Sequence, residues 1–187
     1  MDRVGEIAAL GTALCWTASA LFFERASKRI GVLAVNFYKL LFATVFLAIV
    51  AWISTGNMLP LGASPKAWAF LSLSGLVGFV FTDIFLFSAY VLVGARVTML
   101  FMAASPAVTA LLGFVFLHED IGVKGVLGLC ITASGIAIAT MGKRDARTTM
   151  TPDKQKALPS ASKGMLFASL AMLGQSAGTI LTKIGLG

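Results

Sequence analysis

The chain has 187 residues, of which 58% are hydrophobic and only 12% are charged, and its formal net charge is +7. Soluble domains contain about 25% charged residues, and at a mean hydropathy of +0.90 a core of this size cannot hide so much apolar surface. These values exclude an ordinary water-soluble globular domain. The positive charge does not indicate nucleic-acid binding, because the Lys and Arg residues lie between apolar blocks and form no basic face or base-reading motif.

The apolar residues are grouped into blocks, several of which approach the roughly 20 residues that an α-helix needs to cross a bilayer. The sequence predicts six such helices, at about residues 5–23, 34–53, 68–93, 97–117, 123–141 and 164–184. The predicted fold class is therefore an all-α integral membrane protein. A polar stretch with two prolines, residues 142–163, separates the last two blocks and is predicted to be a linker.

The first block has a competing interpretation as a cleaved signal peptide. Its basic cluster, Arg25, Lys28 and Arg29, follows the apolar run instead of preceding it, and Glu6 interrupts a positive N-terminal region. We therefore expect this segment to remain in the protein as a membrane helix.

The third block carries one carboxylate, Asp83, within an otherwise nearly unbroken apolar run. An exposed carboxylate at the centre of a membrane helix costs about 2.5–3.5 kcal/mol on insertion scales, so Asp83 is expected to face protein or a water-filled cavity. One interpretation is a substrate or proton site. The alternatives are a structural ion pair with Lys39 or Arg96, or a cap for a helix that is broken near Gly78.

The fourth block contains Pro106, which removes a backbone hydrogen bond and is expected to bend the helix. Ser105, Thr109 and Gly113 recur every four residues, a small-residue pattern that lets membrane helices approach closely. This face is predicted to contact another helix. Ser105 and Thr109 are accordingly expected to bond one helix to another rather than to touch a transported molecule.

Four residues are candidates for a substrate-binding site: Asp83, Lys39, Trp16 and Ser105. Lys39 has an alternative role as an interfacial anchor, because a long basic side chain near a helix end can extend to the membrane surface. Trp16 lies deep in the first block, where a packing role is the alternative.

Catalytic patterns do not occur in the sequence, which contains no HExxH, GxSxG, Walker loop or clustered His, Cys and carboxylate set. The sequence therefore predicts no enzyme activity, no cofactor and no metal site. Cys15 and Cys130 lie inside apolar blocks and are expected to be small buried thiols. His118 has no partner at ligand spacing and is expected to be structural or solvated.

Basic residues gather after the first, third and fifth blocks and are sparse in the alternate loops. They are Arg25, Lys28, Arg29, Arg96, Lys143, Arg144, Arg147, Lys154, Lys156 and Lys163. Because Lys and Arg concentrate in cytoplasmic loops, these three loops are predicted to be cytoplasmic and the N-terminus to lie outside.

The sixth block aligns weakly with the first, which suggests an internal repeat. The identical pairs are Gly5 with Gly164, Ala9 with Ala168, Leu14 with Leu173 and Ala18 with Ala177. A repeat unit with an odd number of helices must insert its second copy upside down, as in many transporters built from inverted repeats.

Residues 82–119 read TDIFLFSAYVLVGARVTMLFMAASPAVTALLGFVFLHE, and a Gly-rich helix, GVKGVLGLCITASGIAI, follows. This text resembles the EamA-type repeat of the drug/metabolite transporter superfamily, with its pattern GDxxxxxALxxxGA followed by xxPxxTALLxxxFLxE. Lys39 stands where the family often has Arg. Three positions depart from the family: Thr82 and Thr17 each replace a Gly, and His118 stands where Gly commonly precedes Glu.

The resemblance implies a carrier of small metabolites or drug-like molecules that works by alternating access without a cofactor and lies in the inner (plasma) membrane, as an efflux system. It also implies that residues 5–141 form a first five-helix repeat and that residues 164–187 form the first helix of a second, inverted and incomplete repeat, in a family that typically has ten helices. The expected partners are a small-molecule substrate, the lipid bilayer, and either a second copy of the chain or a missing C-terminal half. The alternative function is a non-transporting membrane assembly partner, or a truncated carrier that must dimerise.

Overall fold

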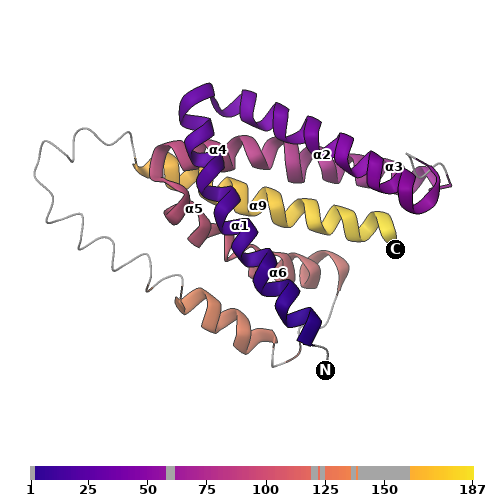
Figure 1. Cartoon of the computed structure of the whole chain (residues 1–187). Helices are drawn as coiled ribbons and strands as arrows, with labels where there is room; N and C mark the ends of the chain where they lie inside the picture. The colour runs from indigo at the N-terminus through magenta and orange to yellow at the C-terminus, as the bar shows by residue number, and fades with distance from the viewer. Residues whose placement is uncertain (1–2, 58–61, 119–121, 123–124, 136–137, 139–160) are drawn as a thin grey trace, which may run out of the picture.

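The computed structural model of the protein describes residues 3–57, 62–118, 122, 125–135, 138 and 161–187. These residues are almost entirely helical, and no strand occurs among them. The elements are α1 (Arg3–Ile30), α2 (Val32–Thr55), α3 (Pro65–Gly75), the π-helical segment η1 (Leu76–Phe81), α4 (Thr82–Val93), α5 (Ala95–Met102), α6 (Ser105–Leu117) and α9 (Ala161–Leu186), as Figure 1 shows.

Five spans within the described residues are long and apolar enough to cross a membrane. They are Val4–Ile30, Val32–Thr55, Pro65–Val93, Ala95–Leu117 and Ser162–Leu186. The predicted all-α membrane fold is therefore confirmed.

Two predicted segments lie partly outside the described residues. Within the fifth predicted helix, residues 123–141, the structure describes a short apolar helix, Gly125–Gly135, and Ile138. Gly122, just before the predicted helix, is also described. The predicted linker, residues 142–163, lies outside the described residues up to residue 160. Helix α9 already begins at Ala161, slightly before the predicted start at 164.

Single glycines separate consecutive helices at two turns. Gly31, between α1 and α2, has a φ of 90°, and Gly94, between α4 and α5, has a φ of 83°. Only glycine adopts such backbone angles without a steric penalty. The chain can therefore change direction within one residue at each of these positions.

The predicted bend at Pro106 takes the form of a break in the fourth span. The chain leaves α5 at Ala103 and Ala104 and enters α6 at Ser105, which places Pro106 in the first turn of the new helix. A proline is tolerated there because the first N–H groups of a helix have no partner within it.

Helix α9 packs closely along the combined length of α3, η1 and α4, and it also contacts α5 and α6 (Figure 1). Glycines of α9 meet this long helix at successive positions: Gly164 against Val93, Gly174 against Thr82, Gly178 against Gly78 and Gly185 against Phe70. The partner numbers fall as the α9 numbers rise, so the two helices run antiparallel. Glycine faces allow membrane helices to approach this closely because no side chain separates the backbones.

The π-helical segment η1 keeps both halves of the long helix in contact with α9. In an unbroken α-helix Ser74 and Thr82 would point about 80° apart, since each residue advances by about 100°. A π turn absorbs one extra residue, which reduces that angle to about 20°. Accordingly Ser74 Oγ donates a hydrogen bond to the Gly178 carbonyl at 2.7 Å, while Thr82 contacts Gly174.

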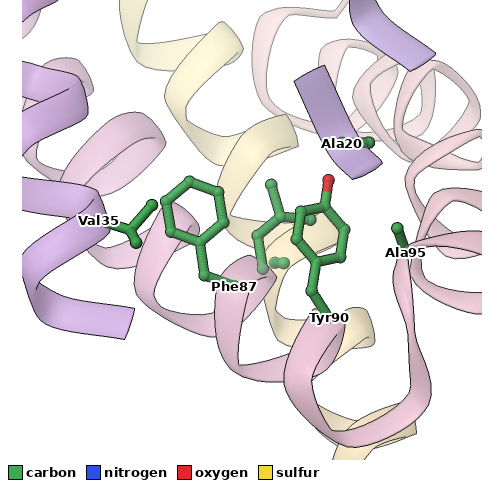
Figure 2. Packing of buried hydrophobic residues seen from close by; sticks show 7 residues of the cluster. Ala20, Val35, Phe87, Tyr90 and Ala95 are labelled. Carbon is green, nitrogen blue, oxygen red and sulfur yellow. The ribbon is translucent and has the colours of Figure 1, made fainter. Parts of the chain in front are cut away.

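The buried apolar core lies where α1, α2, α4, α5 and α9 meet, and Figure 2 shows its side chains. Phe87 and Tyr90 of α4 are each 1% exposed and fill its centre. The ring of Phe87 lies 5.1 Å from that of Phe23 on α1, and Ala20, Val35 and Ala95 close the cluster around them. Large aromatic side chains of α4 therefore hold the first two helices against the rest of the bundle.

One end of the bundle collects basic residues that follow the first and third blocks, together with Lys163 at the start of α9. The last turns of α1 reach the α4–α5 turn, where the Ala95 N–H donates to the Glu24 carboxylate at 2.7 Å, and Gly164 at the start of α9 contacts Val93. Arg25, Lys28, Arg29, Arg96 and Lys163 belong to these three segments. This shared end agrees with the expected pattern of loop charge, and the orientation in the membrane stays a prediction.

The expectation that both cysteines are buried needs correction. Cys15 and Cys130 are exposed rather than buried, because they lie on outward faces of their helices. A small apolar thiol is compatible with a face that meets lipid. His118 ends α6 with a left-handed φ of 54°, which explains why glycine is the common residue at this position of the family pattern.

The Gly178 contact provides a test of the close packing of α9. A Cβ atom at this position would lie 2.7 Å from the Cα atom of Gly78, so we expect Gly178→Ala to lower the free energy of unfolding by about 1–3 kcal/mol. Thermal unfolding of the purified protein in detergent measures this loss. Gly11→Ala in α1 is the matched control, because no atom lies within 4 Å of its added Cβ. Equal melting temperatures for the two variants would contradict the packing.

Candidate functional site

Asp83 forms an ion pair with Lys39, and the pair links α4 to α2. The Lys39 Nζ atom lies 2.6 Å from Asp83 Oδ2, and the side chains are 27% and 5% exposed, respectively. Of the polar partners considered for Asp83, Lys39 is the one that the structure brings to it. An ion pair with Lys39 was one of the alternatives for Asp83, and the structure shows that contact. Lys39 turns into the bundle instead of extending to the membrane surface as an anchor.

Aromatic rings surround the Lys39 ammonium group. Its Nζ atom lies 5.6 Å from the ring centre of Phe87 and 5.9 Å from those of Phe23 and Phe79. A cation within about 6 Å of a ring centre is attracted to the ring's π electrons. These rings replace part of the hydration that the ammonium group loses, so the pair can persist inside an apolar bundle.

The π-helical segment directly precedes Asp83 in the chain. The Thr82 N–H reaches the carbonyl of Val77, five residues back, and the Thr82 Oγ1 donates to the same oxygen at 2.7 Å. From α2, the Asn36 Nδ2 donates to the Val80 carbonyl at 3.0 Å. The helix is therefore not broken near Gly78, as one interpretation had it, but widened by one residue.

Asn36 is a site residue that the sequence interpretation missed. It lies one helical turn before Lys39, so both side chains point from α2 toward the same stretch of the long helix. Asn36 is 4% exposed, and its Oδ1 atom is buried with no hydrogen-bond partner among the described residues. Its signal in the sequence is a lone amide three residues before a lysine within an apolar block.

A groove opens between α1, α5, α6 and α9, with a volume of about 740 Å³. Its lining residues are Trp16, Met99, Met102, Ala103, Ser105, Pro106, Thr109, Ala110, Gln175, Thr179, Ile180 and Lys183. A smaller hollow of about 370 Å³ adjoins it and shares Trp16 and Met99. Trp16 and Ser105 therefore come together in this groove, whereas Asp83 and Lys39 do not line it.

Ser105 also joins α6 to α9. Its Oγ atom lies 3.1 Å from the Oγ atom of Ser176, which in turn donates to the Ser105 carbonyl at 3.1 Å. The expected helix-to-helix contact is confirmed for this residue, which is only 7% exposed. Trp16 differs, because it is 57% exposed and presents its ring to the groove from α1.

Among the described residues, no group of three His, Cys, Asp or Glu side chains is arranged so that it could hold a metal ion. The candidate site residues contribute two chemical features. One is the aromatic-lined Asp83–Lys39 ion pair, and the other is the mostly apolar groove with a few polar groups.

Comparison with known protein families shows to which family this chain belongs. Residues 3–141 match the EamA-like transporter family, which is most of the 187-residue chain. The chain belongs to the EamA-like transporter family. Searches among curated proteins and among solved structures find no match.

Membership makes the chain a multi-pass membrane protein of a transporter family rather than an enzyme family. The matched residues include α1 to α6 and hence the ion pair, the π turn and three of the four helices that line the groove. Helix α9 lies beyond the match.

The ion pair provides a second test. Removing one partner of a buried pair leaves an uncompensated charge and typically costs about 3–5 kcal/mol, so we expect Lys39→Met to lower the unfolding temperature in detergent strongly. Lys39→Met combined with Asp83→Leu is expected to recover most of that loss, because neither charge then remains buried. Lys28→Met removes the more exposed partner of the Glu24 pair and is the matched control, with an expected loss of about 0.5 kcal/mol or less. A Lys39→Met loss as small as that of the control would contradict the burial of Asp83.

Proposed function

We propose that the protein is a carrier that moves a small metabolite or drug-like molecule across the membrane by alternating access. The observation that carries this proposal is the groove between α1, α5, α6 and α9 in a chain of the EamA-like transporter family. Its volume of about 740 Å³ falls in the range of about 300–1,000 Å³ that is typical of small-molecule sites.

The groove's chemistry favours a molecule with an apolar or aromatic body and few polar groups. Trp16, Met99 and Met102 form a soft, polarisable wall that adapts to different shapes. Thr109 and Gln175 add a hydroxyl and an amide that can orient a polar group of the ligand. Most of the binding free energy is therefore expected to come from burial of apolar surface.

The proposed domain organisation is a five-helix repeat, residues 5–141, a linker, residues 142–163, and the first helix of a second repeat, residues 164–187. The directions of α1 and α9 support it. The C-terminal end of α1 and the N-terminal end of α9 both meet the α4–α5 turn, so these two helices run in opposite directions, as the first helices of inverted repeats do.

The break between α5 and α6 is the proposed mobile element. Pro106 lines the groove, and the chain leaves regular helix just before it. A hinge at this position changes the direction of α6 relative to α5 and thereby widens or narrows the groove. We propose that the protein works in the inner (plasma) membrane as an efflux system.

Trp16 is the residue of the groove whose loss tests the binding site. We expect Trp16→Ala to reduce efflux at least tenfold, which corresponds to about 1.4 kcal/mol of lost transition-state binding, in cells that lack their own exporters and are screened across substrate classes. Trp52→Ala is the matched control, because Trp52 of α2 is 56% exposed and does not line the groove. Unchanged efflux by Trp16→Ala would exclude this groove as the substrate site.

The Asp83–Lys39 pair tests a second part of the proposal, in which these two residues take part in substrate or proton binding during the cycle. We expect Asp83→Asn to change the transport rate or its pH dependence, because an amide has no titratable proton and no negative charge to pair with Lys39. Membrane insertion, followed by the presence of the protein in the membrane fraction, should be retained, although the unpaired Lys39 lowers the stability of the fold. Normal flux with a normal pH profile would remove Asp83 from the mechanism.

A further inference from the structure

The π turn is held from two sides by contacts of different kinds. On the α2 side, Asn36 binds the carbonyl of Val80, a residue within the turn, and Lys39 binds Asp83 just after it. On the α9 side, the contact of the turn is backbone against backbone, because a Cβ atom placed on Gly78 would lie 3.4 Å from the Cα atom of Gly178. On the α9 side the side-chain contacts come from Ser74 and Thr82, which flank the turn, whereas the α2 side bonds the turn itself through Asn36.

The consequence of losing the π turn follows from helix geometry. Conversion of Leu76–Phe81 to α-helix shifts the helix on one side of it by one residue, a rotation of about 100° and a translation of about 1.5 Å relative to the other side. Ser74 and Thr82 can then no longer both face α9. Because a Cβ atom at Gly178 would already lie 2.7 Å from the Cα atom of Gly78, a rotation that moves Gly78 out of this contact also requires the two helices to separate slightly there.

The bonds that hold the turn are not all satisfied. Asn36 uses its amide nitrogen on Val80, but its Oδ1 atom is buried without a partner among the described residues. A buried acceptor without a donor costs free energy. The α2 side of the turn is therefore held by one amide hydrogen bond and one ion pair.

We propose that the π turn is a register switch that α2 controls through Asn36 and Lys39. While both contacts hold, η1 stays π-helical and both halves of the long helix face α9. When α2 moves away, η1 becomes α-helical and α4 rotates against α9 while α3 keeps its contact. The link to transport rests on the proposed function, because α9 also lines the groove with Gln175, Thr179 and Ile180.

Two cysteine pairs report the register on either side of the turn. Ser74→Cys with Thr182→Cys replaces a hydroxyl pair 2.6 Å apart and reports contact of α3 with α9. Thr82→Cys with Gly174→Cys reports contact of α4 with α9, and its two Cβ positions lie 3.5 Å apart, at the short end of the range for disulfides. Both pairs are placed in a chain that carries Cys15→Ala and Cys130→Ala.

With α2 intact, both pairs are expected to crosslink under mild oxidation in membranes. In an Asn36→Leu background, and separately in a Lys39→Met background, we expect the 74/182 pair to keep its yield and the 82/174 pair to lose at least fivefold. The matched control is Lys28→Met, which should leave both yields unchanged. Each comparison uses the same cysteine pair with and without the α2 change, so effects of the cysteines themselves cancel.

Retention of both crosslinks in the two α2 variants would overturn the switch, because η1 would then be a fixed feature of the fold. Loss of both crosslinks together would also overturn it, because α9 would then have separated as a whole. Asn36→Leu is the milder change and gives the decisive result if Lys39→Met does not fold. Crosslinking needs no transported molecule, so failure of the groove as a substrate site would appear in the Trp16→Ala efflux and not in this experiment.

Discussion

Hydrocarbon offers no hydrogen-bond partner to a charge, and this constraint shapes the arrangement around Asp83. The carboxylate can remain in the bundle only because Lys39 reaches it from α2 and three phenylalanine rings surround the ammonium group. The same contact fixes the face that α2 presents to α4. Asn36, one turn earlier, then necessarily meets the widened turn that precedes Asp83.

Helix α9 supplies the second organising contact. Its glycines let it lie against α3, η1 and α4 over its whole length, while another part of its surface lines the groove. The helix is therefore shared between the ion-pair side and the groove side of the bundle. A movement of α4 against α9 reaches the groove through this one helix, and no chain of additional contacts is needed.

The candidate residues prove to belong to two places. Trp16 and Ser105 line the groove, whereas Asp83 of α4 and Lys39 of α2 bind each other outside the groove. Hydropathy and motif spacing indicated each of these residues but could not group them, because the grouping depends on which helix faces which. Asn36 was missed for the same reason: a single amide in an apolar helix becomes informative only when its partner, the Val80 carbonyl, is known.

The sequence by itself determined that lipid surrounds the protein, that its apolar blocks form membrane helices, and to which family it belongs. Apolar blocks of membrane-spanning length can be read directly along the chain, and a helix satisfies its own backbone hydrogen bonds in lipid. The motif around residues 82–119 pointed to the family that residues 3–141 match. Only the tertiary structure decided that Lys39 rather than Arg96 pairs with Asp83, that the long helix contains a π turn, and that α9 packs through its glycines. Those features arise from contacts between helices far apart in the chain, and local propensity carries no information about which distant backbone a glycine face or a buried charge will meet.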